Sequence, residues 1–342
     1  MTIAIIGATG LVGQTMLKVL EERQLPIDTL LVAASDQSVG QTVTFGTNPL
    51  TLISMREALE ARPDIALFSI GAELSEIWAP QFARCGTTVI DNSSAWRMHD
   101  NIKLVVPEIN AKTLTAEDKI IANPNCSTIQ LVVALHDLHQ VFGLDRLVVS
   151  TYQSVTGSGQ SGIDQLKNEQ NGIPGDKFYP HTIHENALPQ CDDFSQDGYT
   201  KEEWKLILET KKILNDNSIG ITATAVRVPV IGGHSESVNI TVSRPAELTE
   251  VAQVLKNTAG VVFLEESYPM PLNAYGSDDV FVGRLRVDHS HDRSFNLWIV
   301  SDNLRKGAAT NAVQIAEYLI DNKLSPQNLS SVLTADVRPD SL

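Results

Sequence analysis

The sequence has no surplus of positive charge. Its 342 residues contain 26 Lys and Arg against 41 Asp and Glu, which gives a formal net charge of −15. Binding to nucleic acid or to an anionic membrane needs clustered basic side chains that neutralise phosphates. The composition therefore argues against both partners, although a small anionic ligand needs only a few local cations.

Cysteines and long apolar runs are also scarce. The three cysteines, Cys85, Cys126 and Cys191, include no CxxC pair, which argues against a disulfide framework and a structural zinc site. No apolar run reaches the length of a membrane span. The first residues enter a strand pattern without a basic segment or a cleavage site. We expect a soluble cytoplasmic protein without a metal.

The first half of the chain alternates strand and helix patterns. A β-branched run at 2–6 precedes an amphipathic helix pattern at 11–22, and further strands are predicted at 30–34, 65–70 and 87–91. Such alternation implies right-handed βαβ units and a parallel sheet. We expect residues 1–124 to form a Rossmann-type, doubly wound α/β domain.

The second half has longer strand patterns and fewer helices. Helices are expected at 157–171 and 200–214 on either side of a long loop, 172–197, and strands at 147–153, 222–230, 236–244, 280–288 and 294–301. This pattern favours an α+β domain with a mixed or antiparallel sheet over residues 125–304. A C-terminal helical segment, 305–330, is expected to complete the first domain.

One cysteine stands where its chemistry could be activated. Cys126 lies in the sequence NPNCST at 123–128, between a predicted strand at 119–122 and a predicted helix at 129–141. Free N–H groups and the helix dipole at such a junction favour a thiolate, which is a nucleophile. The alternative is a small buried hydrophobe. The polar neighbours favour chemistry, but these residues alone leave both interpretations open.

A glycine motif marks the first strand-to-helix turn. Gly7, Gly10 and Gly13 have the spacing GxxGxxG in the context that a dinucleotide-binding turn requires. After the second strand, Asp36 could bond a ribose 2′-hydroxyl, which favours NAD, whereas Ser35 and Ser38 could donate to a 2′-phosphate. The alternatives are a plain tight turn and a solvated loop.

Several polar side chains are candidates for binding an anionic substrate. Arg227 and His234 flank a glycine turn, where an arginine could clamp a carboxylate and a histidine could act as acid or base. Gln153 ends a strand that runs into a Gly-Ser turn. Three further candidates are charged: Arg97, Glu202 and Lys205. Each of these residues has a structural or solvated surface role as its alternative.

Eight segments together resemble the bacterial-type aspartate-β-semialdehyde dehydrogenase family. They occur in the family's order and extend over nearly the whole chain, so that together they are far more specific than any one of them. The matching sequences are GATGLVG at 7–13, DNSSAWRM at 91–98, VVPEIN at 105–110, NPNCSTIQ at 123–130, STYQSVTGSG at 150–159, EEWKLILETKKIL at 202–214, RVPVIGGHSESV at 227–238 and VSDNLRKGAATNAVQIAE at 300–317.

The resemblance implies a role for each matching site residue. Cys126 would form an acyl-enzyme thioester, His234 would be the general acid/base, and Gln153 would orient the substrate. Substrate binding would fall to Arg227 for the α-carboxylate, Glu202 for the α-amino group, and Arg97 and Lys205 for the phosphate. Cofactor binding would fall to Gly7, Thr9, Gly10, Leu11, Val12, Ser35, Gln37, Ser38, Thr156, Gly157 and Asn303.

The implied reaction is the NADPH-dependent reductive dephosphorylation of L-4-aspartyl phosphate to L-aspartate 4-semialdehyde. This step serves the biosynthesis of diaminopimelate, lysine, threonine and methionine. The implied assembly is a homodimer, with a tetramer as the alternative. One departure from the family bears on the cofactor: Asp36-Gln37 stands where bacterial relatives often carry Ala-Arg. NADP is expected first, with NAD as the alternative.

Two other functions remain open from the sequence. One is a related acyl-phosphate or acyl-thioester reductase, such as N-acetyl-glutamyl-phosphate reductase or malonyl-CoA reductase. The other is a non-catalytic, cofactor-binding paralogue, which the presence of both Cys126 and His234 argues against.

Overall fold

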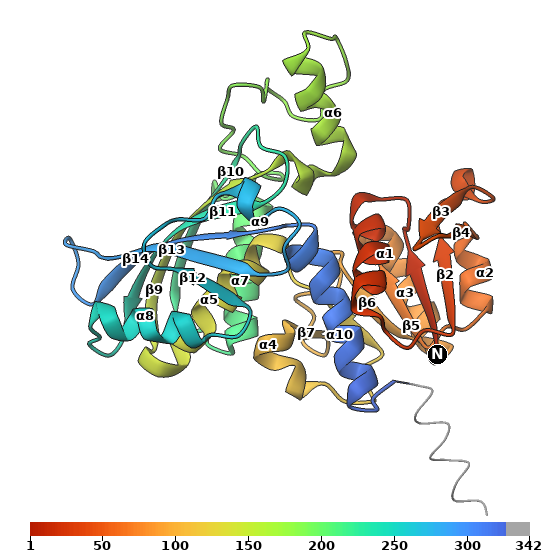
Figure 1. Cartoon of the computed structure of the whole chain (residues 1–342), viewed down its shortest axis with the longest axis horizontal. Helices are drawn as coiled ribbons and strands as arrows, with labels where there is room; N and C mark the ends of the chain where they lie inside the picture. The colour runs from red at the N-terminus through yellow and green to blue at the C-terminus, as the bar shows by residue number, and fades with distance from the viewer. Residues whose placement is uncertain (326–342) are drawn as a thin grey trace, which may run out of the picture. The chain divides into compact units, whose positions relative to one another are not determined.

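The chain folds into two compact units (Figure 1). In this computed structural model, residues 1–325 are described, and the part of the expected C-terminal segment at 326–330 lies outside them. Of the described residues, the first unit comprises 1–123 and 309–325, and the second comprises Pro124–Ala308. The C-terminal helix α10 (Thr310–Asp321) therefore belongs to the first unit.

The first unit contains a six-stranded parallel sheet in the order β2-β1-β5-β6-β8-β7. Its strands are β1 (Thr2–Ile6), β2 (Thr29–Ala33), β5 (Ile65–Phe68), β6 (Thr88–Asp91), β7 (Lys103–Leu104) and β8 (Ile120–Ala122). The Rossmann-type prediction is confirmed. The central strand β5 is apolar along its whole length because both faces of the sheet are covered.

Two apolar cores lie in this unit. Ile3 and Ile5 of β1 belong to one core, together with residues of α1 (Leu11–Arg23) and α10. Ala4 and Ile6 belong to the other, together with residues of α3 (Ala72–Arg84). Successive side chains of a strand point to opposite faces, so the alternation along β1 is what places helices on both sides of the sheet.

The sequence analysis missed most of the short elements of this unit. Helix α2 (Met55–Glu60) lies between β2 and β5, where the alternating pattern predicts a helix. The elements that were not predicted are β3 (Thr42–Phe45) and β4 (Asn48–Thr51), which pair as a hairpin, α4 (Pro107–Asn110) and the short helical turns Asp36–Ser38 and Ala111–Thr113. Elements of three or four residues are too short to display a period.

The second unit contains a six-stranded mixed sheet in the order β10-β9-β11-β14-β13-β12, as predicted. Pairs β9–β10 and β12–β13 are parallel, and the other pairs are antiparallel. Its strands are β9 (Leu144–Gln153), β10 (Gly220–Arg227), β11 (His234–Val242), β12 (Val261–Leu264), β13 (Val280–Val287) and β14 (Ser294–Ser301). Strands β10 and β11 lie two to three residues before their predicted bounds, and Gly232 and Gly233, both with positive φ, stand directly before β11.

The helices of the second unit correct two predictions. Helix α5 (Cys126–Phe142) begins at Cys126 and not at 129, because Asn125 caps it. A turn at Val155–Ser158 precedes α6 (Gly159–Gln170), so the helix predicted at 157–171 begins later. The remaining helices are α7 (Lys201–Leu214), α8 (Leu248–Asn257), α9 (Pro271–Ala274) and the π-helical turn Arg305–Ala309.

A capping box fixes where α7 begins, and side chains of α6 hydrogen-bond to the predicted long loop. The hydroxyl of Thr200 accepts from the Glu203 N–H and the Glu203 carboxylate accepts from the Thr200 N–H, a reciprocal capping box. Residues 172–197 contain no helix or strand, as predicted. Side chains of Gln165 and Glu169 accept hydrogen bonds from backbone N–H groups of this loop.

None of the helices in residues 1–325 is long and apolar enough to cross a membrane.

The β1–α1 turn yields a test of the fold. A Cβ added at Gly13 would lie 2.2 Å from the Gly7 carbonyl oxygen and 2.8 Å from the Ala8 Cα. Gly13→Ala should therefore lower the free energy of unfolding by about 1–3 kcal/mol, measured by urea denaturation. Gly10→Ala is the control, because its added Cβ stays 3.5 Å from the Gly7 oxygen. Equal stability of the two variants would contradict the steric explanation.

Candidate active site

Cys126 is the first residue of α5, and the cap of that helix fixes its position. The side-chain oxygen of Asn125 accepts from the N–H groups of Ser127 at 3.0 Å and Thr128 at 3.3 Å. The N–H of Asn125 itself donates to buried Glu209 at 2.7 Å. The half-buried cysteine thus stands at the positive end of a 17-residue helix, where a thiolate is stabilised.

A buried carboxylate connects this turn to two other elements. Glu202 of α7 accepts from Asn125 Nδ2 at 2.9 Å and from Gln153 Nε2 at 3.1 Å. Gln153, the last residue of β9, also donates to Ser127 Oγ at 3.0 Å. Gln153 and Glu202 are therefore hydrogen-bonded to Ser127 and Asn125, the two neighbours of Cys126 in the chain.

Glu202 is charged despite its burial. Burial would raise the pKa of Glu202, but Lys205, Asn125, Arg227 and Gln153 together hold it at about 2. Lys205 Nζ lies 3.1 Å from a Glu202 oxygen and 2.8 Å from an oxygen of Asp192. Burial lowers the pKa of Lys205, yet the two carboxylates outweigh it and raise that pKa above its ordinary value. The ammonium and both carboxylates are charged near neutral pH.

Arg227 and His234 meet beside Gly157. Arg227 ends β10, and its Nη1 donates to the Ser154 carbonyl at 2.7 Å. A Cβ added at Gly157 would lie 2.7 Å from Arg227 Nη1 and 3.0 Å from His234 Nε2. The absence of a side chain at Gly157 is what lets the backbone pass next to both groups.

The hydrogen bonds of His234 define its tautomer. Its Nδ1 accepts the Ser154 N–H at 3.1 Å, so the neutral ring carries its proton on Nε2. Complete burial, together with the positive charge of Arg227, lowers the pKa of His234 from 6.5 to about 3. The free protein therefore presents a neutral imidazole whose Nε2–H is the donor.

Two predicted cofactor residues of the second unit also come together. Thr156 Oγ1 donates to Asn303 Oδ1 at 2.9 Å, and Ser154 Oγ donates to the same oxygen at 3.1 Å. Ser154 also hydrogen-bonds to His234, and this one residue therefore connects Thr156 and Asn303 to the histidine.

The β1–α1 turn of the first unit fits a dinucleotide pyrophosphate. Gly7 has a φ of +92°, and a Cβ there would lie 2.2 Å from the Ser69 carbonyl oxygen. Gly10 is the N-terminal cap of α1 and has no side chain to block the first N–H groups of that helix. Thr9 lies in the same turn, and Leu11 and Val12 open the helix.

The remaining predicted residues of the first unit follow β2 and β6. Ser35 caps the short turn Asp36–Ser38, which contains Gln37, and Asp36 and Gln37 are exposed. Because β1 and β2 are parallel neighbours, this turn and the glycine turn stand at the same edge of the sheet. Arg97 is buried in the same unit, and its Nη2 donates to the Asn92 carbonyl at 2.7 Å.

Sequence reasoning did not identify four residues of the second-unit cluster. Asn125, as a helix cap, could have been found from its place before the α5 pattern. Ser154 and Asp192 are joined to the cluster by tertiary contacts that no local pattern predicts. Gly307 lies against Cys126, since a Cβ added there would be 3.0 Å from the Cys126 Cβ.

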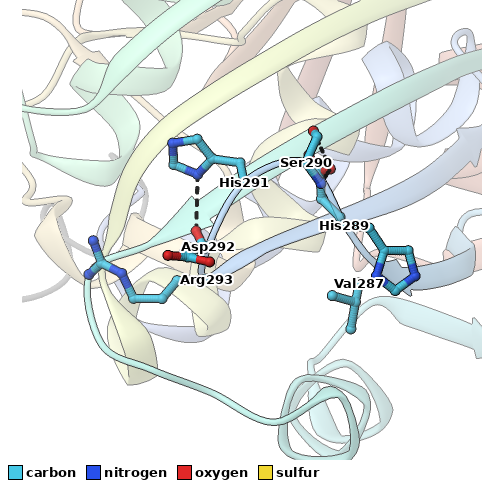
Figure 2. A pocket seen from close by; sticks show the side chains of 7 residues that line it. Val287, His289, Ser290, His291, Asp292 and Arg293 are labelled. Atoms are coloured by element: carbon cyan, nitrogen blue, oxygen red, sulfur yellow. Dashed lines mark hydrogen bonds between the residues drawn. The ribbon is translucent and has the colours of Figure 1, made fainter.

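A cavity of ≈ 730 Å³ at the β13–β14 turn uses none of these residues. It is lined by Val287–Arg293, and Figure 2 shows the His291 ring directed at the Asp292 carbonyl, 3.0 Å from it. Within residues 1–325, no three His, Cys, Asp or Glu side chains are grouped so that they could hold a metal ion.

Two family models match the chain and define its class. The model described as "Semialdehyde dehydrogenase, NAD binding domain" matches residues 2–117, and "Semialdehyde dehydrogenase, dimerisation domain" matches residues 135–306. The chain is thus an NAD(P)-dependent oxidoreductase of the semialdehyde dehydrogenase class, with a small-molecule substrate and a dimerisation domain.

Similar proteins identify the family within this class. The aspartate-semialdehyde dehydrogenase of Aquifex aeolicus is 48% identical over 335 residues, which cover 94% of this chain and 98% of that protein. A structure of aspartate semialdehyde dehydrogenase II from Vibrio cholerae, described as complexed with ASA, has a TM-score of 0.90 and 46% identity over 94% of this chain and 98% of its own. The Candida albicans enzyme, described with NADP, has a TM-score of 0.76 and 26% identity over 94% and 99%.

The chain belongs to the aspartate-semialdehyde dehydrogenase family. This membership confirms the resemblance on which the predicted activity rests, and it favours that activity over the related reductases and the non-catalytic paralogue.

The lowered pKa of His234 predicts a pH dependence of stability. In the unfolded chain this histidine binds a proton below pH 6.5, whereas in the folded protein it does so only near pH 3. Its neutral form therefore supports stability above pH 6.5, and that support is lost as the pH falls towards 3. The free energy of unfolding should rise with pH less steeply in His234→Gln than in the parent protein. Between about pH 4 and 6 the two slopes, measured by urea denaturation, should differ by up to about 1.4 kcal/mol per pH unit. Equal slopes in both proteins would contradict the assigned pKa.

Proposed function

We propose that the protein reduces L-4-aspartyl phosphate to L-aspartate 4-semialdehyde with release of phosphate, in the cytoplasm and as a homodimer. The observation that carries the proposal is Cys126 at the start of α5, with its neighbours Asn125 and Ser127 hydrogen-bonded to Glu202 and Gln153. A thiol suits this reaction because its ester keeps a carbonyl that a hydride can attack.

The proposed first step is acyl transfer to the cysteine. The Cys126 thiolate attacks the acyl carbon, a C–S bond forms, and the C–O bond to phosphate breaks. Arg227 would hold the α-carboxylate, Glu202 the α-amino group, and Lys205 with Arg97 the phosphate. The charges support these roles, because a buried carboxylate suits an ammonium group and a guanidinium suits a carboxylate.

His234 has a proposed role in the second step. When bound, the reduced nicotinamide supplies a hydride to the thioester carbonyl. His234 would donate a hydrogen bond from its Nε2–H to the oxyanion that hydride addition leaves, and would share this proton with the oxygen until the C–S bond breaks and the oxygen becomes the aldehyde carbonyl. The aldehyde then leaves, the Cys126 thiolate is restored, and the imidazole stays neutral.

The proposed cofactor site uses the glycine turn for the pyrophosphate. Gly7, Thr9, Gly10, Leu11 and Val12 would hold the pyrophosphate, and Ser35, Gln37 and Ser38 the adenosine ribose. Thr156, Gly157 and Asn303 would contact the nicotinamide end. Ser35 and Ser38 support NADP, while Asp36 would bond a 2′-hydroxyl and repel a 2′-phosphate. We propose NADP as the preferred cofactor, with NAD as the alternative.

Steady-state kinetics in the oxidative direction test this function. The protein should oxidise aspartate semialdehyde in the presence of phosphate, with a higher kcat/KM for NADP than for NAD. N-acetyl-glutamate semialdehyde is the competing substrate, and activity with that substrate alone would contradict the proposal. A higher kcat/KM for NAD would contradict only the cofactor preference.

The nucleophile has its own test. Cys126→Ala should lower kcat by roughly 10³-fold or more, because no thioester can form. Cys85→Ala is the matched control, since Cys85 is exposed at the end of α3 and should leave kcat unchanged. Full turnover by Cys126→Ala would exclude the thioester route.

A further inference from the structure

The ammonium of Lys205 is bonded to two carboxylates. Asp192 Oδ2 lies 2.8 Å from Nζ, nearer than Glu202 Oε2 at 3.1 Å. The two acids differ in their surroundings. Glu202 is buried and also accepts from Asn125 and Gln153, whereas the Asp192 side chain is 34% exposed. Glu202 is therefore fixed by the cluster, and Asp192 is the partner that solvent or a ligand can replace.

The fold holds Asp192 at this position from both sides. Leu188 forms a bridge with Arg227 before it, and Phe194 forms a bridge with Thr200 after it. Asp192 itself has a φ of +69°, a left-handed conformation that Asp and Asn tolerate better than most other residues. A short segment tethered at both ends thus places one carboxylate on Lys205.

We propose that Asp192 sets the phosphate affinity of the site by occupying on Lys205 the position that the phosphate of the substrate takes. This inference rests on the phosphate-binding role proposed for Lys205. Two carboxylates on one ammonium leave a local charge of minus one, which opposes a phosphate dianion. Displacement of Asp192 removes its contact with the ammonium and leaves Glu202 in place to hold Nζ.

The arrangement fits the direction of the reaction. In the reductive direction phosphate is a product and has to leave before the next substrate binds. A carboxylate that returns to Lys205 competes with the departing phosphate. This competition weakens phosphate binding, and the phosphate is therefore released faster. Asp192 keeps its charge over the neutral range, since partial burial raises its pKa but Lys205 outweighs this and lowers it.

Asp192→Asn removes the charge and preserves the geometry. Asparagine also tolerates positive φ, and its amide oxygen still accepts from Lys205. In phosphate-dependent oxidation of aspartate semialdehyde, KM for phosphate should fall about threefold to tenfold, the range for a partly screened charge contact. KM for the semialdehyde should change by less than about twofold, because Glu202 and Arg227 are unchanged.

Asp193→Asn is the matched control. Asp193 lies next in the chain and pairs with Lys201 of the same helix at 2.8 Å, but its side chain is 77% exposed. The two variants change the net charge equally, so a general electrostatic effect would appear in both. Only Asp192→Asn should change KM for phosphate.

Direct binding of inorganic phosphate, followed by ³¹P line broadening, separates this inference from the proposed function. If the parent protein fails to oxidise aspartate semialdehyde, the function is wrong, yet phosphate binding by the parent and the two variants can still be compared. Tighter binding by Asp192→Asn alone supports the inference. Weaker binding by Asp192→Asn would make Asp192 a positioning residue for Lys205 and overturn it. Equal binding by all three proteins, or none by the parent, would also overturn it.

Discussion

The buried carboxylate of Glu202 is the constraint on which the catalytic unit depends. A charge removed from water is tolerated only where hydrogen bonds and an opposite charge replace the water. Glu202 has amide donors from the cap of α5 and the end of β9 and an ammonium from its own helix, and its pKa is held at about 2 against the effect of burial. Loss of one partner would leave the charge incompletely solvated, so these three elements are held in a fixed relation within the unit.

The same bonds position the reactive groups. Asn125 joins Glu202 to the start of α5 and thereby makes Cys126 the first residue of that helix. Gln153 ends β9, and the next residue, Ser154, offers its N–H to His234 and its carbonyl to Arg227. Cys126, His234 and Arg227 are therefore positioned by adjacent residues of two segments, which gives little freedom for one of them to move without the others.

The sequence predicts those strands and helices that a regular spacing of apolar residues or a local capping motif marks. The parallel sheet follows from alternating patterns, and α7 follows from Thr200 with its acidic first turn. The predicted start of α5 is three residues late because Cys126 to Thr128 are polar and do not continue the helical spacing of apolar residues. Asn125, a favourable N-cap residue, was the signal that could have placed it. Asp192 was out of reach, because its partner lies 13 residues away across a loop without a pattern, and contacts of that kind depend on how the loop is tethered.

Short-range charges reconcile the composition with an anionic substrate. A net charge of −15 repels an anion at long range, but this repulsion is screened within about 10 Å at ordinary ionic strength. Recognition of a substrate that bears both carboxylate and phosphate must then come from cations that are close and poorly screened. Arg227 is buried and the Lys205 side chain is only 25% exposed, and each is already bonded to oxygen acceptors. In the proposed roles of Arg227 and Lys205, binding exchanges one oxygen ligand for another, and its strength is set by the protein's own acceptor as much as by the cation.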